Sequence, residues 1–140
     1  MKSILFLCTG NSCRSQMAHG LAKALLSDHF TSYSAGIETH GLNPSAVKVM
    51  HELNIDISQH QSQNLKEFDT NEFDYVIAVC EHAANNCPTF PNKTKVITQQ
   101  FDDPPKLAKL ANSKEEALSY YRQVRDEIRA WIKTLPAQLN

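Results

Sequence analysis

Two continuous apolar stretches, residues 3–8 and 74–79, interrupt a chain in which apolar residues otherwise recur mostly at helical spacing. Continuous runs of this length are typical of strands that are buried on both faces of a sheet. Residues 31–35 and 95–98 are shorter segments with strand-forming character. The hydrophobic pattern therefore predicts four strands.

Helical patterns fill the intervals between these strands. After the first strand, Met17 and Leu21 recur at helical spacing. Pro44 stands at the first position of a second helix, where its missing N–H would be unpaired in any case. Ser113 caps a last helix, and Glu116, three residues later, completes a capping-box pattern. This alternation predicts an α/β fold with a four-stranded parallel sheet flanked by helices on both faces.

The 140 residues have the length of a single domain, which we expect to span residues 1–140. The formal net charge of −1 argues against a nucleic-acid partner, because such domains carry a basic excess. No apolar run approaches the ~20 residues of a membrane helix, and the short run near the N-terminus lacks a signal-peptide cleavage site. We therefore expect a cytoplasmic protein, and we expect it to be a monomer.

The stretch CTGNSCRS, residues 8–15, follows the first predicted strand and precedes the first predicted helix. Backbone N–H groups in such a turn converge on one point, to which the helix N-terminus adds its positive dipole end. Gly10 and Asn11 permit backbone conformations that other residues resist, and Arg14 offers a planar set of donors to a tetrahedral oxyanion. The expected contacts of a small dianion are Thr9, Gly10, Asn11, Ser12, Cys13, Arg14 and Ser15.

Cys8 stands where this positive field is strongest. A free thiol has a pKa of ~8.5, and a helix N-terminus with a neighbouring arginine lowers it. We therefore expect Cys8 to be a thiolate nucleophile. The alternative for an isolated cysteine at a strand end is a buried structural role, which the spacing Cys-x5-Arg-Ser makes the weaker interpretation. Cys13 is expected to contribute only its backbone N–H.

Cys80 and Cys87 form a second pair of interest, because four cysteines in a cytoplasmic chain indicate metal or redox chemistry rather than structural disulfides. Cys80 follows the strand at residues 74–79, so it belongs to the same sheet edge as Cys8. On one continuous helix the Cα atoms of Cys80 and Cys87 would lie ~10.5 Å apart, whereas a disulfide needs less than ~7 Å. If they pair, the segment must unwind, and its two asparagines and Pro88 weaken the helix.

A zinc site built from Cys80, His82 and Cys87 is the competing interpretation of the same segment. Its spacing fits no common zinc signature, and a fourth ligand would have to come from elsewhere. We therefore expect no metal site. The six histidines are scattered along the sequence, and most are expected at the surface.

The C-x5-R-S loop so close to the N-terminus resembles the low-molecular-weight protein tyrosine phosphatase superfamily. The motifs FLCTGNSCRSQMA, YSAGIE, HGLNPSAV, IDIS and FDDP, with Cys80 and the Cys87-Pro88 pair, resemble more closely the thioredoxin-coupled arsenate reductases built on that scaffold. The resemblance covers nearly the whole chain. The pair Cys80 and Cys87 favours the reductase branch over the phosphatases.

This resemblance implies a reaction and assigns residue roles. Arsenate would be the substrate, attacked by Cys8, while Asp103, the aspartate directly before a proline, protonates the leaving oxygen. Cys80 and Cys87 would then resolve the adduct and end as a Cys80–Cys87 disulfide. Thioredoxin would act as the external reductant, with no bound cofactor.

Two other functions stay open at this point. A phosphatase would use the same loop and a Cys8 phosphoenzyme, although the residues after Asp103, Pro105 and Lys106 among them, lack the aromatic wall usual in those enzymes. A non-catalytic module that binds oxyanions or senses redox state would keep the loop and make no use of Asp103.

Some members of the family that the chain resembles bind a potassium ion beside the loop. Asn11 and Ser34 match that pattern. His19, Gln61 and Gln63 stand where a glutamate, a threonine and an aspartate would be expected. We therefore expect no strong dependence on potassium.

Overall fold

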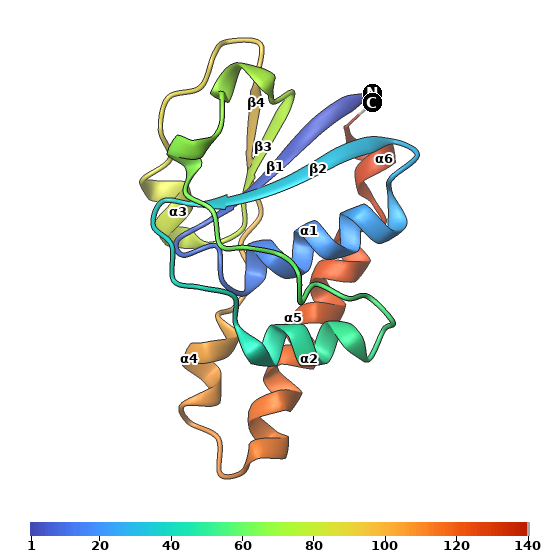
Figure 1. Ribbon diagram of the computed structural model, residues 1–140, viewed down its shortest axis with the longest axis vertical. Coiled ribbons are helices and arrows are strands. Elements are labelled where there is room, and N and C mark those ends of the chain that lie inside the picture. The colour runs from blue at the N-terminus through green and yellow to red at the C-terminus, as the bar shows by residue number, and fades with distance from the viewer. Residues whose placement is uncertain (140) are drawn as a thin grey trace.

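The computed structural model describes residues 1–139, and its sheet has four parallel strands in the order β2-β1-β3-β4. The strands are β1 (Lys2–Cys8), β2 (Phe30–Gly36), β3 (Tyr75–Ala78) and β4 (Lys95–Thr98). All four predicted strands are confirmed. The two continuous apolar runs form β1 and β3 at the centre of the sheet (Figure 1).

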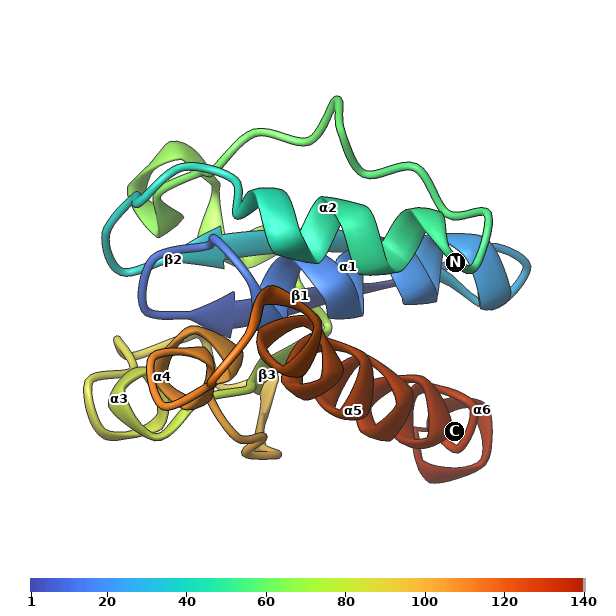
Figure 2. The same ribbon diagram turned by 90° about the horizontal axis from the view of Figure 1, so that it is seen from below.

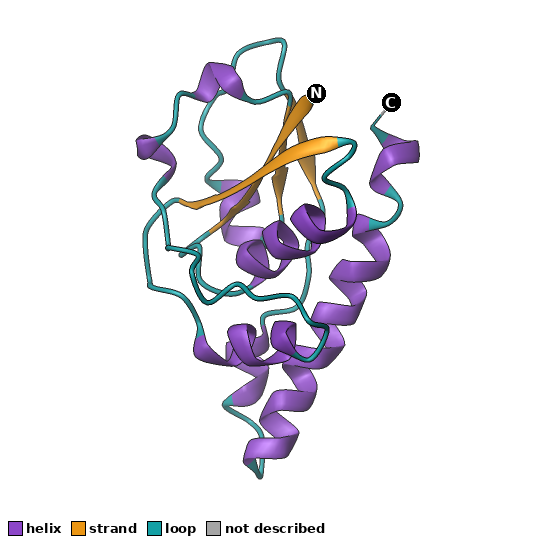
Figure 3. Cartoon of the chain, turned by 45° about the vertical axis from the view of Figure 1, so that its right-hand side comes forward, coloured by secondary structure: helices purple, strands orange, loops and turns teal. Residues whose placement is uncertain are grey.

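Helices cover both faces of this sheet, as predicted. Within the described residues they are α1 (Arg14–Leu25), α2 (Pro44–His51), α3 (Glu81–Asn85), α4 (Pro104–Ala108), α5 (Lys114–Ile132) and α6 (Leu135–Gln138), with short 3-10 turns at Leu65–Glu67 and Thr70–Glu72. Helix α1 packs against β2 and α5, and α2 lies along α1 and α5 (Figures 1 and 2). Helix α3 lies on the other face, next to β1 and β3 (Figure 3).

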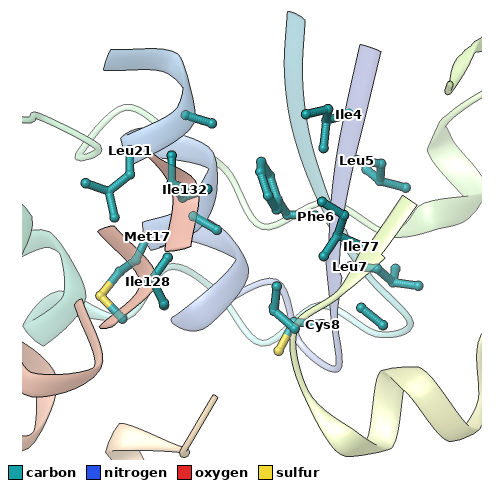
Figure 4. Packing of buried hydrophobic residues seen from close by; sticks show 14 of the residues in the cluster. Ile4, Leu5, Phe6, Leu7, Cys8, Met17, Leu21, Ile77, Ile128 and Ile132 are labelled. Atoms are coloured by element: carbon teal, nitrogen blue, oxygen red, sulfur yellow. The ribbon is translucent and has the colours of Figure 1, made fainter. Parts of the chain in front are cut away.

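Strand β1 forms the centre of the core because both of its faces are covered. Its residues from Ile4 to Leu7 have no exposed surface. Phe6 points toward α1 and α5, whereas Leu5 and Leu7 point to the side of α3 (Figure 4). The ring of Phe6 meets the edge of Trp131 in α5, with 6.3 Å between the ring centroids. A continuous apolar run is what such a doubly covered strand requires.

The predicted cap of α5 is only half confirmed. The Ser113 hydroxyl accepts a hydrogen bond from the Glu116 N–H at 3.0 Å, as the capping-box pattern predicts. The Glu116 carboxylate accepts from the N–H of Asn112 at 2.7 Å instead of from that of Ser113. The side chain therefore fixes the chain one residue before the helix cap.

The helix after β3 is shorter than the sequence analysis allowed. Cys80 caps α3, the helix ends with Asn85, and Cys87 lies beyond it. Two consecutive asparagines and the following Pro88 explain the early end, since neither residue type favours continuation of a helix. The separation of ~10.5 Å that a continuous helix would impose therefore does not apply to Cys80 and Cys87.

No helix in the described part of the chain is long and apolar enough to cross a membrane. The short helices α4 and α6 were not predicted from the sequence. Each has a proline in its first turn and is too short to show hydrophobic periodicity.

The position of Phe6 yields a test of the core. We predict that Phe6→Ala lowers the free energy of unfolding by about 3–5 kcal/mol, because it leaves a cavity among fully buried neighbours. Denaturant unfolding followed by circular dichroism measures the loss. Leu110→Ala is the control, since Leu110 is 77% exposed and its truncation should change stability by less than about 0.5 kcal/mol. Equal losses in the two variants would contradict this account of the core.

Candidate active site

The loop between β1 and α1 is fixed by hydrogen bonds that its carbonyl groups accept. Segments that follow β2 donate to them: the N–H of Ile37 to the carbonyl of Cys8 (3.2 Å), Glu38 to Thr9 (2.8 Å), His40 to Gly10 (2.9 Å) and Asn43 to Ser12 (3.0 Å). The N–H groups of residues 10–14 donate no hydrogen bond to any residue from 1 to 139. The loop thus keeps these donors free, and their role as oxyanion contacts stays a prediction.

Asn11 adopts the left-handed backbone conformation expected from the sequence, with φ of 48°. It is fully buried, and its side-chain NH₂ donates to the Ser15 hydroxyl at 2.9 Å. Its side-chain oxygen accepts from the Gln16 amide at 3.0 Å and from the Gln63 N–H at 2.7 Å. These three bonds compensate the cost of the unusual conformation.

Gly10 is required for a different reason from the one expected. Its φ is not positive, but a Cβ at this position would lie 2.2 Å from the ring nitrogen Nδ1 of His40. The constraint is therefore the close approach of the His40 side chain and not a special backbone conformation.

A cavity of about 490 Å³ opens in front of the loop. It is lined by Cys8, Thr9, Gly10, Ser12, Cys13, Arg14, His40, Asn43, His82, Asp103 and Pro105. Most of the predicted oxyanion contacts lie on its wall, whereas Asn11 and Ser15 lie behind it and are buried. The site therefore has one layer of residues that can touch a ligand and one that supports them.

Arg14 and Asp103 lie next to each other on the wall of this cavity. The Arg14 guanidinium donates to the Phe101 carbonyl at 2.9 Å and lies 3.9 Å from the Asp103 carboxylate. The first contact fixes the plane of the guanidinium, and the second brings an acid to the mouth of the loop. The Asp103 side chain is 41% exposed, so it can exchange protons with solvent.

Two cysteines from distant parts of the sequence meet at the floor of the site. Cys8 ends β1, and Cys80 follows β3, the parallel neighbour of β1. Figure 4 shows Cys8 at the carboxyl end of its strand, and the hydroxyl of Thr9, the next residue in the sequence, lies 3.3 Å from the Cys80 sulfur. All four cysteines are reduced, and only Cys87 is partly exposed.

The charge of this pair lies on the sulfur that the sequence analysis did not choose. The pKa of Cys80 is lowered to about 5, mainly because the Cys8 thiol donates to it, with further hydrogen bonds from Thr9 and the Ala83 N–H and the charge of Arg14. The pKa of Cys8 is raised, because its thiol gives that hydrogen bond and because it is buried. These opposite shifts favour the negative charge on Cys80 before reaction, and the role of Cys8 as the attacking nucleophile stays a prediction.

The other two cysteines do not ionise near neutral pH. Burial raises the pKa of Cys13 to about 12. Burial also raises the pKa of Cys87. Any thiolate that forms between about pH 4 and pH 8 therefore belongs to the pair Cys8 and Cys80.

Comparison with known proteins places this geometry in a family. The family described as low molecular weight phosphotyrosine protein phosphatase matches residues 3–140. The chain belongs to that family. It is 49% identical over 133 residues to an arsenate reductase of Halalkalibacterium halodurans, which covers 95% of this chain and 94% of the relative.

A second relative and a solved structure agree with this assignment. The chain is 50% identical over 127 residues to an arsenate reductase of Bacillus subtilis, covering 91% of this chain and 89% of the relative. A structure titled as an arsenate reductase in oxidized state matches with a TM-score of 0.82 and 31% identity over 100% of both chains. Within the phosphatase family, the chain thus groups with proteins named arsenate reductase.

The sequence analysis considered His82 only as a zinc ligand and His19 only beside a potassium site, and it assigned no role to His40 or His60. His40 and His82 line the cavity, and His82 Nδ1 lies 3.0 Å from the Thr9 hydroxyl. Behind the loop, the rings of His19 and His60 stack with 4.6 Å between their centroids. No spacing in the sequence indicates these positions, because each depends on segments that only the fold brings together.

His60 supports the loop through Gln16. The His60 ring nitrogen Nδ1 lies 2.9 Å from the Gln16 side-chain oxygen, and the Gln16 amide donates to Asn11. His19 contacts the Ser34 hydroxyl at 2.9 Å, and burial, with the charges of His60 and Lys23, lowers its pKa to about 4. Both rings belong to the support of the phosphatase-type loop and not to the surface. Within residues 1–139, no group of three or more His, Cys, Asp or Glu side chains is placed to hold a metal ion.

The shared proton of the cysteine pair gives the second prediction. We expect the ultraviolet absorbance of the thiolate, near 240 nm, to rise with a midpoint near pH 5 in the wild-type protein. Because the Cys80 pKa is lowered, the thiolate is present above this midpoint and lost below it. In Cys80→Ser the step at pH 5 should vanish, and Cys8 should titrate at a lower pH than in wild type, since the interaction that most raises its pKa is gone.

Cys87→Ser is the control for this titration, because burial keeps the Cys87 pKa high and its loss should leave the step in place. Persistence of the low-pH step in Cys80→Ser would show that the thiolate is not on Cys80.

Proposed function

We propose that this protein reduces arsenate to arsenite by a relay of three cysteines, Cys8, Cys80 and Cys87. One observation carries the proposal: Cys8, in a loop built for an oxyanion, and Cys80 follow two adjacent parallel strands at the same edge of the sheet, and the Thr9 hydroxyl of that loop lies 3.3 Å from the Cys80 sulfur. A phosphatase loop alone does not need a second sulfur at this place. The names of the relatives that share half of its residues support the same substrate.

Arsenate enters the cavity as a tetrahedral dianion and takes the free N–H groups of the loop and the Arg14 guanidinium. Attack on arsenic needs the Cys8 thiolate, so the shared proton moves from Cys8 to Cys80, and the Arg14 guanidinium and the free N–H groups of the loop offset the added negative charge. Cys8 then attacks arsenic and forms the S–As bond. Asp103 gives a proton to the departing oxygen, which leaves as water.

The redox step follows from the position of Cys80. Having lost its proton again, Cys80 attacks the Cys8 sulfur, and an S–S bond forms as the S–As bond breaks. The electron pair of the S–As bond goes to arsenic, so As(V) becomes As(III) and leaves as arsenite. The two thiols together lose two electrons, which balances the reduction.

Cys87 completes the relay by attacking Cys80 and releasing Cys8 as a thiol. Cys80 begins α3 and Cys87 lies beyond its end, and we propose that the helix opens to bring the two sulfurs together. The helix is only five residues long, so little regular structure has to be lost. An external dithiol protein of the thioredoxin type then reduces the Cys80–Cys87 disulfide, and its potential of about −270 mV suits an exposed disulfide.

Hydrolysis of phosphate esters through a Cys8 phosphoenzyme is the second candidate, because the family is named for phosphatases. Asp103 and the loop would serve it equally. Among residues 1–139, however, the cavity wall contains His40, His82 and Pro105 and no Phe, Tyr or Trp side chain. A phenyl ring would therefore find no aromatic wall, which favours arsenate over phosphotyrosine as the substrate.

We also propose that the reaction does not depend strongly on potassium. The side-chain oxygen of Asn11 already accepts two hydrogen bonds. His19 stands where an acidic ligand would be expected. Its lowered pKa keeps the ring neutral, and a neutral ring offers no negative charge to a cation. The residues present therefore do not fit a potassium site.

The compartment and the assembly state follow from the same relay. Cys80 and Cys87 must start as thiols, and the cytoplasm keeps thiols reduced. All residues of the proposed reaction come from one chain, so a monomer suffices.

The relay is tested by mixing the protein with arsenate, thioredoxin, thioredoxin reductase and NADPH. We expect NADPH oxidation that requires arsenate. Cys80→Ser should abolish it, because no second sulfur can break the S–As bond. Cys87→Ser should stop after one turnover with a Cys8–Cys80 disulfide, detectable by mass spectrometry of peptides. Sustained arsenate reduction by Cys80→Ser would overturn the relay.

The role of Asp103 is tested with a phosphatase substrate such as para-nitrophenyl phosphate. If the wild-type protein hydrolyses it, Asp103→Asn should lower the rate by about 10²–10⁴, the usual scale for loss of a general acid. Asp102→Asn is the matched control, because Asp102 is adjacent, exposed and outside the wall of the cavity. Equal rates for the two variants would remove Asp103 from this role.

A further inference from the structure

The hydroxyl of Thr9 lies between two groups that both compete for its proton. Its oxygen is 3.3 Å from the Cys80 sulfur and 3.0 Å from the His82 ring nitrogen Nδ1. Thr9 belongs to the loop, whereas Cys80 caps α3 and His82 lies in the first turn of that helix. The contact therefore joins the oxyanion loop to the segment that must move in the proposed relay.

A hydroxyl has one proton, so it donates to one of these neighbours and accepts from the other. If His82 carries a proton on Nδ1, that N–H donates to the Thr9 oxygen and leaves the Thr9 proton for the Cys80 sulfur. If His82 is neutral with its proton on the other ring nitrogen, Nδ1 accepts the Thr9 proton. The Cys80 thiolate then loses one of its hydrogen-bond donors.

We propose that His82 is a positioning residue for Cys80: by donating from Nδ1 to the Thr9 hydroxyl, it directs the hydroxyl's proton onto the Cys80 sulfur. The sulfur then holds three donors, the Cys8 thiol, the Ala83 N–H and Thr9. A hydrogen bond to an ionised acceptor is about twice as strong as one between neutral groups. Loss of the Thr9 donor therefore shifts the ionisation of the pair.

The charges around His82 favour this arrangement when substrate is bound. On the cavity wall it faces Arg14 from α1, His40 from the segment after β2 and Asp103 from the segment before α4, and Glu81 adjoins it in α3. An oxyanion in the cavity adds negative charge on this wall and attracts an N–H of the His82 ring. When α3 opens, His82 leaves with it and frees the Thr9 hydroxyl.

The inference rests on the proposed relay for its meaning, but its test does not. His82→Asn and His82→Asp are nearly isosteric, and both reach the Thr9 hydroxyl at the position of Nδ1. Asparagine can donate to it, whereas an ionised aspartate can only accept. Because His82 is exposed, neither change removes a core contact. The readout is the thiolate absorbance near 240 nm between pH 4 and pH 8, which reports only the pair Cys8 and Cys80.

We expect the thiolate midpoint of His82→Asn to equal that of the wild type and the midpoint of His82→Asp to lie about one pH unit higher. The negative charge of aspartate contributes to this shift without passing through Thr9. Both variants are therefore also made in the background of Thr9→Val, which removes the hydroxyl, and of Thr9→Ser, which keeps it. The proposal requires the difference in thiolate midpoint between His82→Asp and His82→Asn to shrink at least twofold in the Thr9→Val background. The difference must persist in the Thr9→Ser background.

An unchanged difference in the Thr9→Val background would show that His82 acts only through its charge and would overturn the proposal, as would equal midpoints for the two His82 variants. Arsenate turnover is measured in parallel. If the wild-type protein does not reduce arsenate while the titration behaves as expected, the relay fails and the positioning role of His82 stands. If arsenate turnover is normal and the aspartate and asparagine variants of His82 titrate with the same midpoint, the positioning role of His82 fails and the relay stands.

Discussion

The parallel pairing of β1 with β3 is the constraint on which the site depends. It aligns Leu7 with Ala78 at the end of the ladder, so that the chain leaves both strands at the same edge of the sheet. Cys8 and Cys80 are the residues at these exits, 72 positions apart in the sequence. A shift of the register by one residue would turn one of the two side chains to the opposite face and separate the sulfurs. The apolar residues that bury both faces of β1 thus also fix the distance between two reactive groups.

Many residues support the loop at this edge of the sheet. Its carbonyls are tied to the chain after β2, and Asn11 is tied to Ser15, Gln16 and Gln63. These bonds fix the backbone before any ligand arrives, so the ligand does not have to bear the entropy cost of ordering the N–H groups. The supporting residues are mostly neutral. The positive charge directed at the ligand therefore comes chiefly from Arg14 and from the N-terminus of α1.

The two sulfurs share one negative charge, and this links binding to chemistry. Hydrogen bonds to the Cys80 sulfur lower the pKa of Cys80, whereas burial contributes to raising that of Cys8, so the charge of the pair is favoured on Cys80. A single proton that moves between two sulfurs can thus prepare first one nucleophile and then the other, without a separate base for each. Thr9 follows Cys8 in the sequence and contacts Cys80, so it adjoins both nucleophiles.

Residues 8–15 and the four strands could be predicted from the sequence alone, because each depends on local features: the length of an apolar run, a cysteine and an arginine at fixed spacing, an asparagine able to take a left-handed conformation. The early end of α3 was within reach of the same reasoning, since Asn85, Asn86 and Pro88 are visible in the sequence. The ionisation of Cys8 was not. It depends on the hydrogen bond to Cys80, and local reasoning counted the helix and Arg14 but not that neighbour. His19, His40, His60 and His82 were likewise decided by the tertiary structure, because a hydrogen bond or a stacked ring needs a partner at a defined distance, and only packing brings such partners together.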